Sequence, residues 1–262
     1  TLGDMNVWNL TSMIKTPARP AKPFRHELKF LINEGERELL KTRMRPLFQL
    51  DPHAVDGQYL IRSLYFDDYW NSAYEEKDMG VMERQKYRIR LYNCQDDVIQ
   101  LERKRKSGSY IFKESARLTR DEVECILRGE YAFLLQHPAP LCREFYVECV
   151  SQVMRPRVIV DYDREPFIME AGTVRVTFDR DVRAAILSED LFDPALPTLP
   201  VLEPGKTVME VKFTEFLPDI VRNTILPSAA EYTALSKYVL CYEKTRYLHG
   251  FDYWAESEGV KR

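Results

Sequence analysis

Six short stretches of the sequence alternate apolar and charged residues, so that most of their charged side chains fall on one face of a strand. These stretches are Arg25–Lys29, Lys86–Arg90, Gln100–Lys104, Tyr162–Arg164, Arg175–Asp179 and Glu210–Lys212. Successive side chains of a strand point to opposite faces, and an antiparallel sheet normally turns its charged face to water. Several strands rich in Arg and Lys, interspersed with Glu, favour instead a second interior that is lined with charge. The pattern alone leaves open the alternative of ordinary solvated sheet faces.

The basic side chains of these stretches are of the types that bind phosphate. Arginine engages phosphate oxygens as a planar fork, whereas lysine acts as a movable point charge. Like charges packed in a space of low dielectric constant repel one another, so they persist only beside compensating anions. A phosphate chain would supply those anions. The first candidates are Lys29, Arg88, Arg90, Lys104, Arg164 and Arg175.

Three glutamates, Glu27, Glu102 and Glu210, lie among these basic residues. They can offset part of the positive charge, and they can also hold a hard divalent cation, which takes oxygen ligands and bridges them to phosphates. Phosphoryl transfer requires mainly positioning and charge neutralisation. The residue types therefore fit metal-assisted chemistry on a triphosphate or a polyphosphate.

The composition excludes several other classes of protein. A net charge of −3 argues against a nonspecific nucleic-acid binder, although 38 Lys and Arg are present. Five cysteines without CxxC spacing are interpreted as reduced thiols of a cytoplasmic protein, and four scattered histidines disfavour a His-based zinc site. No apolar run approaches the roughly 18 residues of a membrane span. The motifs GxxxxGK[ST], GxGxxG, HExxH and GxSxG are absent from the sequence.

The pattern of elements predicts one α+β domain, a barrel of about eight antiparallel strands with helices packed outside. We expect strands at 24–32, 59–66, 86–92, 98–104, 110–118, 157–163, 173–180 and 207–214. Helices are expected near 33–45, 71–77, 119–129, 131–136, 142–154, 219–225 and 232–247. The domain is predicted to occupy residues 23–250, between a flexible N-terminal tail (1–22) and a C-terminal tail (251–262). Arg103, Arg105 and Lys106 fall on the opposite strand face or in a turn and are expected to lie outside.

These segments together resemble the VTC domain, the polyphosphate polymerase domain of the triphosphate tunnel metalloenzyme superfamily. The resemblance is carried by Phe24–Phe30, Ser63–Asp67, Lys86–Tyr92, Leu101–Lys104, Val160–Phe167, Val174–Asp179, Met209–Phe213 and Ser236–Tyr238, in that order. The resemblance implies a CYTH-like antiparallel tunnel that transfers the γ-phosphoryl of ATP to a growing polyphosphate chain. It also implies Mn²⁺ or Mg²⁺ as cofactor, ATP and polyphosphate as partners, and no nucleic acid or membrane span; regulatory partners stay open.

The resemblance further implies roles for single residues. The residues expected to act on the transferred phosphate are Lys29, Arg88, Arg90, Lys104 and Arg164. The residues expected to bind substrate are Glu27, Lys86, Glu102, Lys113, Tyr162, Arg175, Lys212, Ser236 and Lys237. Glu210 is the expected metal ligand. An ion pair with Lys212 is the structural alternative for Glu210, and Ser236 is alternatively an ordinary helix serine.

Two positions depart from the family pattern. Arg25 stands where related triphosphatases have the first of two glutamates, which favours the polymerase branch over a hydrolase. Ala234 stands where polymerases carry a basic residue, so one phosphate contact is absent there. Two alternatives therefore stay open: a metal-dependent triphosphatase or polyphosphatase in the same tunnel, and a noncatalytic polyphosphate-binding domain.

Overall fold

The structure is a computed structural model that describes most of the chain between residues 26 and 248. The described ranges are 26–54, 56–108, 110–186, 188–214, 216–226, 231–232 and 235–248. The two predicted tails, 1–22 and 251–262, lie outside these ranges, as do Arg25 and Ala234. What the sequence indicates about those positions therefore stays a prediction.

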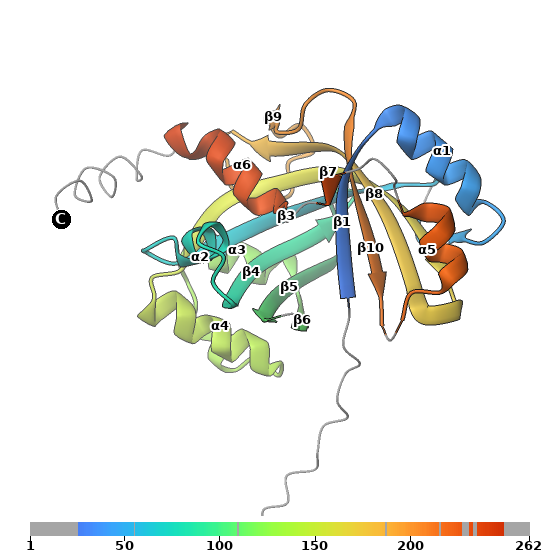
Figure 1. The fold of residues 1–262 in the computed structure, drawn as a ribbon. Coiled ribbons are helices and arrows are strands. Elements are labelled where there is room, and N and C mark those ends of the chain that lie inside the picture. Colours follow the sequence, from blue (N-terminus) through green and yellow to red (C-terminus); the bar gives the residue numbers. More distant parts are fainter. Residues whose placement is uncertain are drawn as a thin grey trace, which may run out of the picture.

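One antiparallel sheet of eleven strands runs through the described residues and curves strongly (Figure 1). Its long strands are β1 (His26–Asn33), β3 (Tyr59–Asp67), β4 (Glu83–Tyr92), β5 (Gln95–Ser107), β6 (Tyr110–Leu118), β7 (Arg155–Met169), β8 (Val174–Ala185) and β10 (Lys206–Phe213). The short strands are β2 (Gln49–Leu50), β9 (Thr198–Pro200) and β11 (Glu231–Tyr232). The order across the sheet is β11-β1-β10-β8-β7-β3-β4-β5-β6, with β2 beside β7 and β9 beside β8.

Six α-helices are present in the described part of the chain. They are α1 (Glu34–Met44), α2 (Ser72–Asp78), α3 (Arg120–Leu127), α4 (Pro140–Ser151), α5 (Asp219–Ile225) and α6 (Lys237–Thr245). Two helices begin at capping side chains: Asn33 accepts the Glu36 N–H at 2.8 Å, and Thr119 forms a reciprocal capping box with Glu122. None of the described helices is long and apolar enough to cross a membrane.

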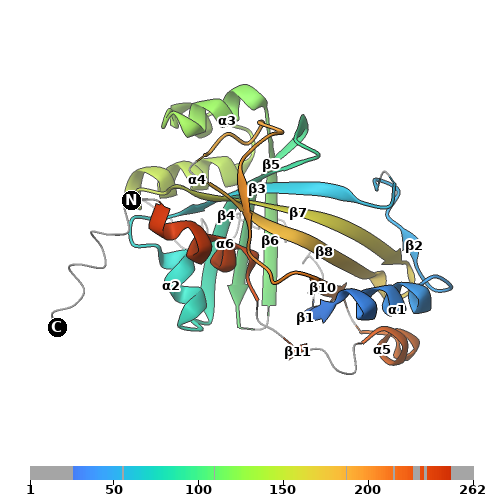
Figure 2. The ribbon, with the colours of Figure 1, turned by 90° about the horizontal axis from the view of Figure 1, so that it is seen from above.

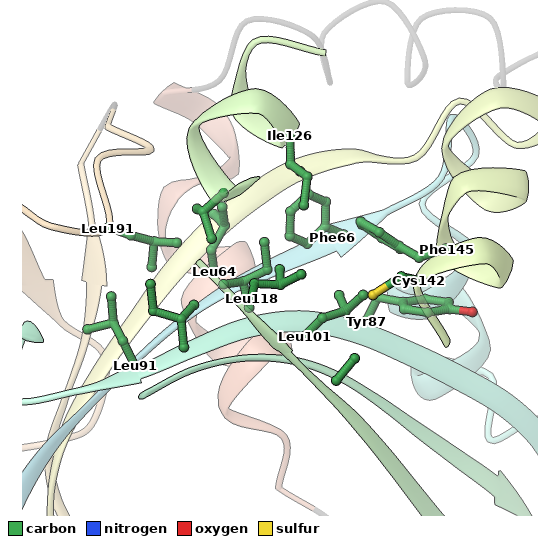
Figure 3. Packing of buried hydrophobic residues seen from close by; sticks show 14 of the residues in the cluster. Leu64, Phe66, Tyr87, Leu91, Leu101, Leu118, Ile126, Cys142, Phe145 and Leu191 are labelled. Carbon is green, nitrogen blue, oxygen red and sulfur yellow. The ribbon is translucent and has the colours of Figure 1, made fainter. Parts of the chain in front are cut away.

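Two hydrophobic cores lie on the outer face of the sheet, at opposite ends of the molecule (Figures 1 and 2). At one end α3 and α4 cover β3, β4 and β5, and Phe145 of α4 packs between Phe66 and Tyr87 (Figure 3). At the other end α1 and α5 bury Leu40 and Val221 against β8 and β10. The apolar side chains of each alternating strand pack into these outer layers. Because successive side chains point to opposite faces, the charged side chains of the same strands point to the concave face.

Helix α6 is the exception to the expected placement of helices outside the sheet. Its residues Tyr238, Cys241 and Tyr242 form a third core with Val160 and Tyr162, which lie on the concave face of β7. The helix therefore fills part of the concave face and brings its first residues toward the charged part.

The predicted fold class, α+β with an antiparallel sheet and helices packed against it, is confirmed. The long strands match the expected ones, whereas β2, β9 and β11 have two or three residues each and leave no periodic signal. In the described residues the barrel is not closed by backbone pairing, because the strand order ends at β6 on one side and at β1 with β11 on the other.

Several predicted boundaries were wrong. The strands β7 and β8 run to Met169 and Ala185 instead of 163 and 180, and two other boundaries also differ. The expected turn between the fourth and fifth strands, residues 93–97, shrinks to Asn93 and Cys94, which both adopt positive φ angles of 52° and 54°. Such a two-residue turn matches the twist of a hairpin, so β5 starts earlier than expected. The expected helix at 232–247 begins only at Lys237, because Tyr232 pairs with Phe30 as part of β11.

We expect Phe145→Ala to lower the free energy of unfolding by about 3–5 kcal/mol, because it leaves a cavity between α4 and the sheet. Urea denaturation followed by circular dichroism measures this change. Val147→Ala on the same helix is the matched control, since the Val147 side chain is 56% exposed; its effect should stay within about 0.5 kcal/mol. A loss below about 1 kcal/mol for Phe145→Ala would contradict the assignment of this core.

Candidate phosphate-binding site

The concave face of the sheet carries the predicted site residues. Residues directly opposite in an antiparallel pair share a face, and Lys29 lies opposite Glu210, as Arg164 lies opposite Asp179. The Nζ atom of Lys104 on β5 lies 2.6 Å from Oε2 of Glu27 on β1, although five strands separate β5 from β1 in the sheet. The sheet therefore curls until its two ends face each other across the charged side chains.

Glu210 on β10 is the most crowded carboxylate of this face. Its Oε1 accepts a hydrogen bond from Lys237 Nζ at 2.9 Å, and its Oε2 accepts one from Lys212 Nζ at 2.7 Å. Lys29 and Arg164 lie 3.6 Å and 3.5 Å away. Burial alone would raise the pKa of Glu210, but these four cations outweigh it and hold the pKa well below its usual range. Glu210 is therefore an anion that links β1, β7, β10 and α6.

Asp179 on β8 is a second buried carboxylate, which the sequence analysis left without a role. Its two oxygens accept hydrogen bonds from Nε and Nη2 of Arg164 at 2.6 and 2.7 Å, and Lys237 Nζ lies 2.6 Å from Oδ2. The Arg164 and Lys237 charges outweigh the burial of Asp179 and lower its pKa. The alternation of Arg175, Thr177 and Asp179 on one strand face was the signal that could have identified it.

Tyr162 joins the arginines of β4 and β7 to α6. Its hydroxyl accepts a hydrogen bond from Arg90 Nη2 at 3.0 Å. The Arg164 guanidinium and the Lys237 ammonium lie over its ring, 5.2 and 4.9 Å from the centroid. Burial would raise the pKa of Tyr162, but Arg164, Arg90 and Lys237 outweigh it and lower the pKa. The ring and its hydroxyl thus hold three cations in place.

Glu102 on β5 organises the other side of the concave face. It accepts a hydrogen bond from Arg88 Nε at 2.7 Å and pairs with Lys113 Nζ at 2.5 Å. Arg88 also donates to the Tyr65 hydroxyl, and Arg90 donates to Ser63. Tyr65 and Ser63 were not predicted; they lie opposite Arg88 and Arg90 on β3.

Glu27 bridges the two ends of the sheet. Besides Lys104, its carboxylate has Lys212 at 3.6 Å and Lys29 at 3.8 Å, so Glu27 belongs to a set of ion pairs that cross between strands. The set is not on a wet face, because only 9% of the Glu27 side chain is exposed. The three lysines outweigh the effect of burial and hold the pKa of Glu27 well below its usual range.

The remaining predicted residues lie at the margins of this face. Lys86 donates to the Ser236 hydroxyl at 3.3 Å, and Ser236 caps α6 by accepting the Val239 N–H at 3.5 Å. Arg175 donates to Asp51 and to the Tyr59 hydroxyl, both at 2.9 Å. Every predicted site residue is thus on the concave face or at its rim.

Arg103 lies outside the concave face, as predicted, but it is buried. It is on the outer face of β5, but only 4% of it is exposed. It donates to Glu114, to Glu144 of α4 and to the Tyr87 hydroxyl. Arg103 is therefore a structural link between the sheet and α4, separate from the concave face.

Positive charge exceeds negative charge on the concave face. Its basic side chains are Lys29, Lys86, Arg88, Arg90, Lys104, Lys113, Arg164, Arg175, Lys212 and Lys237. Its carboxylates are Glu27, Glu102, Asp179 and Glu210, with Asp51 beside Arg175. Grouped cations in partly dry surroundings favour a bound anion with several charges. The arrangement fits a chain of phosphates.

The comparison with family models agrees with this geometry. The model described as VTC domain matches residues 24–246. The chain belongs to the VTC domain family. The match extends from β1 to α6 and so includes every strand that contributes to the concave face.

The comparisons with solved structures and with curated proteins add nothing to the assignment of this VTC domain. The PH1819 protein of Pyrococcus horikoshii OT3 is 16% identical, with a TM-score of 0.44, over 84% of this chain and 99% of its own. A Bacillus halodurans protein provisionally named an adenylate cyclase (bh2851) is 13% identical, with a TM-score of 0.45, over 77% of this chain and 86% of its own. The search of curated proteins found no match. The family assignment rests on the VTC domain match alone.

Glu210 and Glu27 are the carboxylates that would hold a metal ion beside a phosphate in this VTC domain. The described residues include no group of three or more His, Cys, Asp or Glu side chains that could hold an ion. Mg²⁺ and Mn²⁺ in phosphate sites use one or two carboxylates and take further oxygens from the phosphates. Glu210, with Glu27 on the neighbouring strand, fits that donor set.

Binding of long-chain polyphosphate should take up protons at about pH 8 to 9, because it favours the charged forms of Lys104 and Lys113. Although 40% of the Lys104 side chain is exposed, loss of hydration around its amino group lowers its pKa to about 8. The same cause lowers the pKa of Lys113 to about 8. Both lysines therefore lose their charge as the pH rises through about 8, and affinity should fall in that direction.

Calorimetry in buffers of different ionisation enthalpy measures this proton uptake. Internal phosphates of a long chain do not titrate in this range, so the uptake reports the protein. The Lys104→Met variant should lose part of the uptake. Binding without uptake at about pH 8.5 would contradict the assignment of these lysines to the site.

Proposed function

We propose that this VTC domain is an ATP-dependent polyphosphate polymerase. The observation that carries the proposal is the excess of positive charge on the concave face, where β4, β7 and α6 place Arg88, Arg164 and Lys237 around buried carboxylates. A triphosphate and a polyphosphate chain are both linear polyanions that such a face would hold. The resemblance of the sequence to polyphosphate polymerases supports ATP as the phosphoryl donor.

The proposed reaction is a direct phosphoryl transfer. A terminal oxygen of the polyphosphate chain attacks the γ-phosphorus of ATP, and the bond to the oxygen that bridges the β- and γ-phosphates breaks. ADP leaves with that electron pair, and the chain is one phosphate longer. Arg88, Arg90 and Arg164 would neutralise the charge of the transferred group, which is the main requirement of this reaction.

Buried contacts prepare these residues for that role. Asp179 holds the Arg164 guanidinium by two hydrogen bonds, and Glu102 and Tyr65 hold that of Arg88. Groups that are already oriented need little rearrangement when a charge develops beside them. A divalent ion bound by Glu210 and the phosphates would supply further charge neutralisation.

A noncatalytic polyphosphate-binding domain is the second candidate. The observation that favours it is that Glu210 is surrounded by Lys29, Arg164, Lys212 and Lys237, which gives this carboxylate a purely structural use. Hydrolysis of a triphosphate, with water as acceptor, is possible on the same face. We also propose that the protein is cytoplasmic and that its metal cofactor is Mn²⁺ or Mg²⁺.

Incubation with ATP and Mn²⁺ tests the proposal directly. We expect polyphosphate and ADP to appear together, and chelation of the metal ion to stop both. Orthophosphate without polyphosphate would identify a hydrolase. Tight polyphosphate binding without any product would identify the noncatalytic domain.

A pair of variants assigns the activity to the concave face. Arg88→Ala should lower the rate at least about 100-fold, because it removes a preorganised donor from the transferred phosphate. Arg105→Ala, on the outer face of the neighbouring strand β5, should leave the rate unchanged. Circular dichroism of both variants confirms that they fold. Equal rates for the two variants would remove Arg88 from the site.

A further inference from the structure

The curled sheet has an open side between β6 and β1. Among the described residues β6 pairs only with β5, and β1 pairs with β11 on its outer edge only at Phe30 and Leu31. No backbone ladder in the described part of the chain joins β6 to β1. Among the described residues, the contacts across this side are instead made by side chains.

One contact crosses this side directly, and two more connect β1 and β4 to the start of α6. Lys104 of β5 contacts Glu27 of β1 at 2.6 Å. Nearer to α6, Lys29 donates to the Leu235 carbonyl at 3.4 Å, and Lys86 donates to Ser236 at 3.3 Å. Each of these lysines is a cation that an entering phosphate could engage in place of its present partner. An ion pair exchanges partners more readily than a strand ladder breaks, because no backbone group is left without a hydrogen bond.

The basic side chains on this side are more exposed to solvent than Arg164 and Lys237 at the back of the concave face. Lys113 and Lys104, at the open side, are 45% and 40% exposed. Arg164 and Lys237, at the back, are each 8% exposed. A polyanion approaching between β6 and β1 would meet accessible lysines first and the buried cations last.

We propose that a polyphosphate chain enters this domain sideways, between β6 and β1, by an internal segment and not by its end. Phosphates of that segment replace Glu27 as the ion-pair partner of the Lys104 ammonium, and the segment then lies along the concave face. The substrate class is long linear polyphosphate bound anywhere along its length. The inference rests on the proposed binding of polyphosphate to this face, and it is independent of whether the domain then catalyses transfer.

Polyphosphate with a streptavidin molecule attached through biotin at each end tests the proposal with the unmodified protein. A chain blocked in this way cannot be threaded, but it can still enter from the side. We expect it to bind with an affinity within about threefold of the unblocked chain of the same length. Binding weaker by at least about 100-fold, while a chain blocked at one end binds normally, would show threading and overturn the proposal.

Two controls place the blocked chain on the concave face. Tripolyphosphate should displace it, and Arg88→Ala should weaken the blocked and the unblocked chain by the same factor, whereas Arg105→Ala should affect neither. If tripolyphosphate does not displace the blocked chain and Arg88→Ala does not change its affinity, the blocked chain binds elsewhere. That result also overturns the proposal. If the unblocked chain itself fails to bind, the proposed function fails, and that result differs from selective loss of the blocked chain.

Discussion

Electrostatic repulsion among the basic side chains of the concave face is the constraint on which the rest of the structure depends. Charges from several strands and from α6 are gathered where water is partly excluded, so each must have an anion nearby. Asp179 and Glu210 supply this anion at the back of the face, where they share Arg164 and Lys237. Glu27 and Glu102 supply it beside Lys104 and Lys113. The basic side chains of the face still outnumber its carboxylates, and this excess positive charge is what makes the face suited to a polyanion.

The outer layers of the fold make that concentration of charge possible. Two apolar cores, beneath α3 with α4 and beneath α1 with α5, use the apolar half of each strand and leave the other half for the concave face. Helix α6 then closes part of that face with Tyr238, Cys241 and Tyr242, and its first residue is Lys237. The stability of the domain and its charge thus come from opposite faces of the same strands.

The sequence was sufficient to predict which face each charged residue of a strand takes, because alternation depends only on local geometry. Lys29, Arg88 and Arg164 were identified in this way, and their meeting on one face followed from the family resemblance. The position of α6 inside the curve, the pairing of Tyr232 with Phe30 and the open side between β6 and β1 depend on contacts between distant segments. Asp179 was overlooked for another reason: its alternation was visible, but its role appears only when Arg164 and Lys237 approach from different elements.

The central claim is that cations from separate elements converge on one bound polyanion. A crystal structure of the domain grown with tripolyphosphate tests it most directly. The account predicts phosphate oxygens within hydrogen-bond distance of Arg88 on β4, Arg164 on β7 and Lys237 on α6, in a single bound molecule. Tripolyphosphate bound only on the outer face, beside residues such as Arg105, with the concave face unchanged, would contradict it.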